Sequence, residues 1–263
     1  MQRTIRAEAV RPRCGLAAVR VPSTKLLERG SPLIRDSLGG EEAALATRPP
    51  SNREENHVTI KLYGVPQSRS SRCLWLLEEL GVRYENVPVS FAGDAQKPDF
   101  LAINPNGRIP ALDDNGVVLF ESLAINIHLA RKYDDGRGLW PQAADDQSRA
   151  IQWSIWAMTE LEPSAMVVMM NRALLPEAQR DEAAAKGAEQ ALAKPLGVLE
   201  GSLRDRPYLL GDAFSVADLN VAGVLSMAAA VGRMKLDATP NAAAWYARST
   251  GRPALMRALG RRS

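Results

Sequence analysis

The residue types with the clearest chemical potential are three serines at the start of a stretch with helical spacing, Ser68, Ser70 and Ser71. The N-terminus of a helix favours anions because its first N–H groups are unpaired and its dipole is positive. A hydroxyl there can donate a charge-assisted hydrogen bond to a thiolate. Lowering a thiol pKa of about 8.5 by about two units requires roughly 2.7 kcal/mol, and one hydrogen bond to a charge contributes about 1.5–3 kcal/mol. The serines could therefore stabilise an anion such as a thiolate at the start of this helix, with a helix cap or a serine turn as the simpler alternative.

A second candidate feature is the loop at residues 104–112, which contains Asn-Pro and Asn-Gly turn dipeptides. Pro110 suits the first residue of a strand because proline has no N–H to donate. The Ile109-Pro110 bond can be cis, which would turn the backbone groups of Ile109 outward. Residues 114–116 read as a hairpin turn between apolar runs. The loop is therefore a backbone docking point for a peptide-like ligand or, alternatively, an ordinary loop and hairpin.

The elements that would hold these residues follow from hydrophobic periodicity. Ser122 is predicted to cap a helix, with Glu121 beside its positive end. Gly81 is predicted to end the helix that the serines open. The resulting order, βαβαββα, is thioredoxin-like. The predicted strands are 59–63, 83–89 and the two of the hairpin, and the predicted helices are 70–80, 97–103 and 122–133.

The remainder of the chain is predicted to be an all-helical domain, because strand signals vanish after a linker at 134–138. Pro163 should kink a long helix over 145–170, and Pro176 suits the first position of a helix over 176–203. Within residues 211–219, Ser215 and Asp218 have the spacing of a capping box. A last helical region is predicted over 245–257. The predicted domains are thus 57–137 and 138–263.

The first 56 residues differ from the rest in composition. They carry five prolines and 10 Lys/Arg against 7 Asp/Glu, whereas 57–263 holds 23 of each. We expect 1–56 to be a disordered or spurious N-terminal extension. An Arg-rich organelle transit peptide is the alternative.

Composition narrows the class of protein. The 263 residues are 46% hydrophobic and 24% charged, with a net charge of +3, which describes a globular protein and gives no support to nucleic-acid binding. No apolar run has the length of a membrane span. Cys14 and Cys73 form no metal or redox motif, and there are two histidines. We therefore expect no metal and a reducing, cytoplasmic compartment.

Three motifs together resemble the glutathione S-transferase family. The loop at 104–112 with the Glu121-Ser122 pair resembles its glutathione-binding signature. The segment 61–73 resembles the active site of serine-type members, in which the hydroxyl lies four residues before an arginine that opens the helix. Residues 211–219 resemble the N-capping motif of the core helix in the helical domain. The chain is similar over about 57–263 to serine-type, theta/phi-like bacterial members.

The resemblance implies roles for particular residues. Ser68 would be the catalytic hydroxyl, with Ser70 and Ser71 left open as alternatives. Tyr63 lies too early to be a catalytic tyrosine, and Cys73 falls inside the helix and is expected in the core. The implied glutathione-binding residues are Lys97, Arg108, Ile109, Pro110, Glu121 and Ser122. For the two cations, Lys97 and Arg108, a solvated surface charge is the alternative.

The implied function is conjugation of the glutathione thiolate to a hydrophobic electrophile in a homodimer, with glutathione as co-substrate and no other cofactor. A glutathione-binding or regulatory module without turnover, or a glutathione-dependent peroxidase or dehalogenase, is the alternative. Near the end of the kinked helix lie candidate residues for the electrophile pocket, which can equally be helix core: Met166, Met169, Met170 and Asn171.

Overall fold

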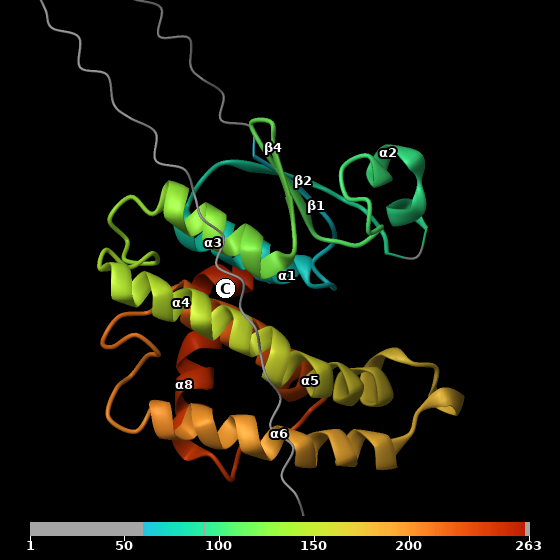
Figure 1. Cartoon of the computed structure of the whole chain (residues 1–263). Coiled ribbons are helices and arrows are strands. Elements are labelled where there is room, and N and C mark those ends of the chain that lie inside the picture. The colour runs from blue at the N-terminus through green and yellow to red at the C-terminus, as the bar shows by residue number, and fades with distance from the viewer. Residues whose placement is uncertain (1–59, 92, 261–263) are drawn as a thin grey trace, which may run out of the picture. The chain divides into compact units, whose positions relative to one another are not determined.

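The computed structural model describes residues 60–91 and 93–260, so the N-terminal extension and Thr59 lie outside the described residues. The order βαβαββα is confirmed, and every later element in the described part of the chain is a helix (Figure 1). A mixed sheet has the strand order β2-β1-β3-β4, in which β2 is parallel to β1 and the other pairs are antiparallel. Its strands are β1 Ile60–Tyr63, β2 Tyr84–Val87, β3 Ala111–Asp114 and β4 Val117–Phe120.

Alternation explains why the centre of this sheet holds together. Ile60 and Leu62 of β1 are buried, and Leu62 lies opposite Leu112 of β3. Successive side chains of a strand point to opposite faces, so these residues share one face and face the helices. The edge strand β4 differs, because Val117 and Val118 are nearly half exposed.

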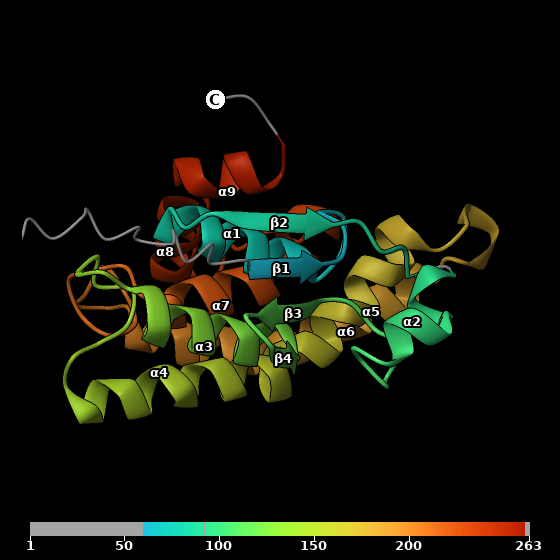
Figure 2. The ribbon, with the colours of Figure 1, turned by 90° about the horizontal axis from the view of Figure 1, so that it is seen from above.

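Helices α1 (Ser70–Leu80) and α3 (Ser122–Tyr133) lie side by side between the sheet and the helical domain (Figures 1 and 2). The prediction that Gly81 ends α1 is confirmed by its left-handed φ of 62°. The short helix α2 (Pro98–Leu101) follows a 3₁₀ turn, Asp94–Gln96, and lies apart from α1 and α3. The sheet thus carries two long helices whose N-termini belong to the two predicted ligand-binding segments.

The helical domain is built around α7, of which nine residues are buried. The predicted long helix is continuous but contains a π-helical segment, η2, just before Pro163. A proline lacks the N–H that would pair with the preceding turn, so the irregularity lies where the kink was expected. The segments are α4 Ala144–Trp156, η2 Ala157–Leu161, α5 Glu162–Met169, η3 Met170–Leu174, η4 Glu177–Gln179, α6 Glu182–Ser202, α7 Val216–Ser226, η5 Met227–Val231, α8 Pro240–Thr250 and α9 Pro253–Ala258.

Three predicted helix starts are wrong. The last helical region begins at Pro240 rather than at residue 245, and it is divided into α8 and α9. Ser122 is the first residue of α3, and Glu121 takes the cap position instead. Pro176 does not open α6, because a 3₁₀ turn intervenes and Asp181 caps the helix by accepting a hydrogen bond from the Ala184 N–H at 3.0 Å. A side-chain acceptor that satisfies a free helical N–H outweighs the favourable backbone angle of proline.

The predicted capping box at the start of α7 is confirmed. The Ser215 N–H donates to the Asp218 carboxylate at 3.0 Å. The same carboxylate also accepts from the Leu209 N–H and from the indole N–H of Trp245, both at 2.8 Å. Asp218 therefore does more than cap its own helix, because it joins the 208–211 turn and α8 to α7.

A second buried carboxylate, that of Asp114, ties the sheet to α3. It accepts hydrogen bonds from Lys132 and His128, both at 2.7 Å, and from Tyr133 at 2.6 Å. Burial by itself would raise the pKa of Asp114, but these hydrogen bonds outweigh it and hold the pKa at about 2.

This cluster makes stability depend on acid pH. Because the pKa of Asp114 is lower in the folded chain than the unfolded value of about 3.9, ionised Asp114 contributes roughly 2.6 kcal/mol above the unfolded pKa. This contribution is lost as the pH falls through 2. Asp114→Asn should therefore be less stable by about that amount at pH 7, and the difference should shrink toward pH 2. Urea unfolding of both proteins across this range measures it, and a pH-independent difference would contradict the assignment.

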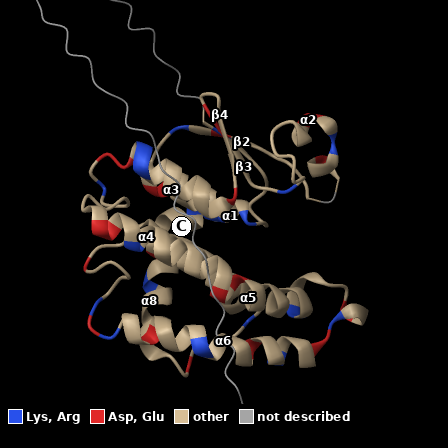
Figure 3. Ribbon diagram, viewed as in Figure 1, with Lys and Arg blue, Asp and Glu red and all other residues tan. Residues whose placement is uncertain are grey.

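Basic and acidic residues are interspersed along the helices of both domains (Figure 3). In the described part of the chain, no helix combines the length and apolar character needed to cross a bilayer.

Candidate active site

The predicted serine cluster lies at the mouth of α1. The Ser68 hydroxyl donates to the Val65 carbonyl at 2.7 Å and accepts from the Ser70 N–H at 3.1 Å. Its oxygen also lies 2.9 Å from the hydroxyl of Ser70. Because the proton of Ser68 points to Val65, the Ser70 hydroxyl is the donor of that contact. A rotation of the Ser68 hydroxyl away from Val65 would direct its proton to a ligand at the helix mouth.

Ser70 is fully buried and lies against Gly64, which follows β1. A Cβ at Gly64 would lie 2.0 Å from the Ser70 hydroxyl oxygen, and Gly64 has a φ of 148°. Position 64 is therefore restricted both by backbone conformation and by contact. The same Cβ would lie 3.5 Å from the Cβ of Ile109, so Gly64 also adjoins the proline loop.

Gly64→Ala is expected to lower the free energy of unfolding by at least about 2 kcal/mol, because it adds backbone strain and a clash with Ser70. Displacing Ser70 should also disturb Ser68 and reduce activity. Chemical denaturation and an activity assay measure the two effects. Gly116→Ala is the matched control, since Gly116 also has a positive φ, of 88°, but its Cβ would meet nothing within 4 Å. Equal losses in both variants would show that the contact with Ser70 is unimportant.

The proline loop contains the cis peptide bond that its sequence allows. Ile109-Pro110 is cis, and both residues are buried immediately before β3. The buried side chain of Asn104 closes the loop by donating to the Arg108 carbonyl at 2.6 Å. The structure thus brings Ile109 beside Gly64 and, through it, near the serine cluster.

Lys97 and Arg108 are surface cations on neighbouring segments, which the side chain of Gln96 links by donating to the Gly107 carbonyl at 2.9 Å. The Lys97 ammonium pairs with Asp94 at 2.7 Å, and hydrogen bonding to that carboxylate raises the pKa of Lys97. Among the described residues, Arg108 forms no ion pair, and it is exposed.

The start of α3 meets the start of α1. Glu121 has a φ of 69°, an uncommon value for a residue with a side chain, and is exposed. Ser122, the first helical residue, is buried, and its hydroxyl lies 3.3 Å from the Arg72 guanidinium of α1. Two positive helix ends therefore converge, a favourable place for a ligand that carries both a thiolate and a carboxylate.

Two residues of this region were missed as functional candidates by the sequence analysis. Arg72 was used only as a marker of the helix start, and Glu162 not at all. Both are buried, and the Glu162 carboxylate of α5 pairs with Arg72 at 3.2 Å and also with Arg69. The pairing spans 90 residues, so no local pattern could have revealed it.

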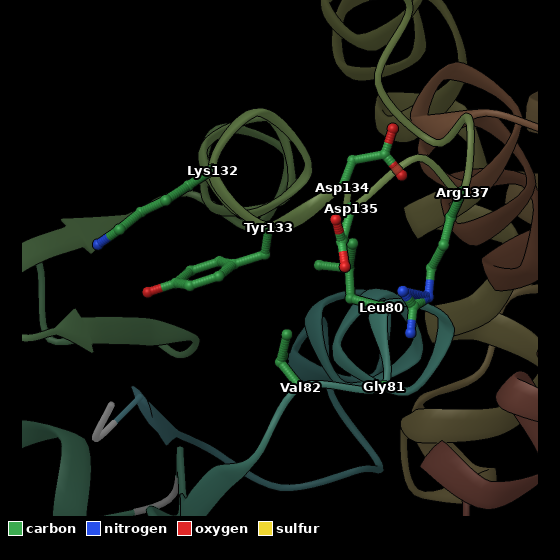
Figure 4. A pocket seen from close by; sticks show the side chains of 8 residues that line it. All are labelled: Leu80, Gly81, Val82, Lys132, Tyr133, Asp134, Asp135 and Arg137. Atoms are coloured by element: carbon green, nitrogen blue, oxygen red, sulfur yellow. The ribbon is translucent and has the colours of Figure 1, made fainter. Parts of the chain in front are cut away.

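The thiol of Cys73 and the pocket at the far ends of α1 and α3 do not belong to this site. Cys73 is buried as expected, and burial raises the pKa of its thiol, so the thiol is not activated as a nucleophile. A pocket of about 580 Å³ lies at the C-terminal ends of α1 and α3. In Figure 4 the Lys132 ammonium points away from Arg137. Helix C-termini disfavour anions, so this pocket does not suit a thiolate. In the described ranges, no three metal-ligating side chains come close enough to hold an ion.

Of the candidate residues for the electrophile pocket, Met166 and Met169 are partly buried and pack against the main core. The side chain of Asn171 donates a hydrogen bond to the Val167 carbonyl and accepts one from the Asp181 N–H.

A small mixed sheet with a cis-proline loop, covered by helices and joined to a helical domain, defines a two-domain protein of thioredoxin-like type.

Comparison with known proteins specifies the family. The model of the glutathione S-transferase N-terminal domain matches residues 58–131, and that of the C-terminal domain matches 159–253. Glutathione S-transferase 3 of Zea mays is 38% identical over 76% of this chain and 93% of its own length. Glutathione S-transferase GstB of Escherichia coli is 31% identical over 76% and 97%.

Solved structures agree. The theta class glutathione S-transferase of Xanthomonas axonopodis pv. citri, solved with glutathione bound, has a TM-score of 0.71 and 30% identity, and the match covers 77% of this chain and 97% of that one. The chain belongs to the glutathione S-transferase family. It is therefore an enzyme for which glutathione is the co-substrate.

Proposed function

We propose that this transferase conjugates glutathione to a hydrophobic electrophile and that Ser68 stabilises the attacking thiolate. The observation that carries the proposal is the position of the Ser68 hydroxyl, 3.1 Å from the Ser70 N–H at the start of α1. A thiolate at that point would accept a hydrogen bond from the Ser68 hydroxyl and would lie at the positive end of the helix. Ser70 is the less suitable donor, because it is fully buried against Gly64.

The remaining contacts to glutathione are assigned by matching its polar groups to backbone and charged groups of the site. The outward backbone of Ile109 beside cis-Pro110 would pair with the cysteinyl backbone. Glu121 and Ser122 would bind the γ-glutamyl ammonium and carboxylate, since a carboxylate is favoured at the free N–H groups that open α3. Arg108 and Lys97 would face the glycyl carboxylate. Arg108 is the better candidate to bind the glycyl carboxylate, because Lys97 already pairs with Asp94.

The electrophile would bind between the mouth of α1 and α5. Glu162 of α5 contacts Arg69, the residue after Ser68. Met166 lies one turn further along α5, on the same side of the helix, and is only partly buried. A flexible thioether suits varied apolar ligands.

Retention on immobilised glutathione, followed by assay with 1-chloro-2,4-dinitrobenzene and with an organic hydroperoxide, tests the function. We expect retention and conjugate formation. Retention without turnover would favour a binding module, and peroxide reduction without conjugation would favour a peroxidase.

We also propose a cytoplasmic homodimer. Glutathione must be reduced to act as a nucleophile, and the cytoplasm keeps thiols reduced. The edge strand β4 and helix α4, which lie on the same side in Figure 2, carry exposed apolar side chains suited to a second copy. These residues are Val117, Val118, Phe120, Ile151 and Ile155. Sedimentation equilibrium should give twice the chain mass, and the mass of one chain would contradict the dimer.

A further inference from the structure

The Arg72 side chain crosses the boundary between the two domains and is almost fully buried, with 2% exposure. From α1 its guanidinium reaches the Ser122 hydroxyl of α3 at 3.3 Å and the Glu162 carboxylate of α5 at 3.2 Å. It also donates to the Gly223 carbonyl at 3.4 Å and to the sulfur of Met227 at 2.8 Å. Four elements thus fix the orientation of one guanidinium.

We propose that Arg72 is a positioning residue that makes the Ser122 hydroxyl a dedicated donor to the γ-glutamyl carboxylate of glutathione. This inference rests on the proposed glutathione site. A guanidinium has donors and no acceptor, so in the contact with Arg72 the Ser122 oxygen must accept. The single hydroxyl proton of Ser122 is thereby left for another partner, and a carboxylate at the start of α3 is the acceptor that the site would supply.

Glu162 keeps this guanidinium in place. Its carboxylate is 5% exposed and pairs with both Arg69 and Arg72, so neither a buried cation nor a buried anion is left alone. Burial lowers the pKa of Arg72 and the pairing with Glu162 opposes that effect. A single nitrogen of Arg72, Nη1, donates to both Ser122 and Glu162. The other two nitrogens hold the group in place, because Nε donates to Gly223 and Nη2 to Met227. A lysine has one nitrogen and cannot hold this orientation through all four contacts.

Gly223 of α7 provides the space for the Arg72 stem. A Cβ at position 223 would lie 3.0 Å from Cγ of Arg72, a contact tighter than ordinary packing allows. The helical domain therefore supplies a carboxylate, a carbonyl oxygen and the necessary gap, and the thioredoxin-like domain supplies the arginine. The orientation of Ser122 is set by both.

Calorimetry with two ligands tests the proposal: glutathione, and an analogue in which hydrogen replaces the α-carboxylate of the γ-glutamyl residue. Arg72→Met should weaken glutathione binding roughly tenfold and leave binding of the analogue unchanged. In a Ser122→Ala background the same substitution should add nothing. The KM for glutathione should rise while kcat at saturating glutathione stays near the wild-type value. Arg149→Met is the control, because Arg149 is exposed and, within residues 60–91 and 93–260, its ion pair is with Asp146 alone.

Equal weakening of both ligands by Arg72→Met, or no weakening of either, would overturn the proposal. If Arg72→Met does not fold, Arg72→Lys keeps the buried charge and decides the question with the same two ligands, by the same selective loss. Wild-type protein that binds neither ligand would refute the proposed function itself, and this inference with it. Wild-type binding combined with an unselective Arg72 variant would refute the inference alone.

Discussion

Ser68→Ala is expected to raise the pKa of the bound glutathione thiol by about two units, since it removes a hydrogen bond to charge that contributes about 1.5–3 kcal/mol. The wild-type pKa is the lowered one, so the two proteins should differ most between the two pKa values. Near pH 7 the conjugation rate should fall by more than about tenfold, and the rates should converge above the unperturbed thiol pKa. Glutathione affinity should change little, because the backbone contacts and the α3 site remain.

Ultraviolet titration of the thiolate in the complex with glutathione, together with the pH profile of kcat/KM, measures this effect. The matched variant is Ser71→Ala, which removes a hydroxyl that donates to the Ser68 carbonyl at 2.9 Å. If Ser71→Ala shifts the thiol pKa and Ser68→Ala does not, the assignment of Ser68 is wrong. An unshifted pKa in both variants would exclude Ser68 and Ser71 as the group that stabilises the thiolate.

The largest effect on stability is expected from Asp218→Asn. The Asp218 carboxylate has no exposure and accepts from four donors, two at each oxygen. An amide offers one acceptor oxygen and places an NH₂ against the other two donors. Leaving two buried donors unsatisfied costs about 1–3 kcal/mol each, and two charge-assisted bonds are lost. We therefore expect a loss of about 4 kcal/mol, which is a large part of the roughly 5–15 kcal/mol by which folded domains are stable.

Thermal and urea unfolding measure this loss, and Asp212→Asn, an exposed carboxylate in the same segment, is the control. Trp245→Phe removes one of the four donors. In the Asp218→Asn background it should therefore be less damaging than in wild type. Additive losses would indicate that the indole N–H does not depend on Asp218.

Local patterns were sufficient to predict most of the fold. Helix α1 was located within its observed bounds because its apolar residues recur at helical spacing and Gly81 supplies the left-handed end. The capping box of α7 could be predicted because its two partners are three residues apart in the sequence. The start of α6 does not follow from the favourable backbone angle of Pro176, because Asp181 is a capping residue that a helix-forming run follows.

The site was less accessible to sequence reasoning, because its residues meet only after folding. The Ser68 neighbourhood depends on Gly64, whose role follows from its closeness to Ser70 rather than from its place in a motif. Charge alone predicts Glu121 beside the helix but not its positive φ, which occurs at the single residue between β4 and α3. The role of Glu162 required knowledge of which helix faces α1, which is a matter of packing between domains.

The shared ion pairs at Glu162 have a consequence for recombining domains among transferases. A chimaera that joined residues 57–137 of this chain to a foreign helical domain would bring Arg69 and Arg72 to a new partner surface. Without an acid at the position of Glu162, the buried guanidinium of Arg72 would lose its counter-charge. With a side chain at the position of Gly223, the stem of Arg72 would have no space to pass α7. Compatible halves must therefore be matched at these two positions, and a library screened on them should contain far more folded members than one assembled at random.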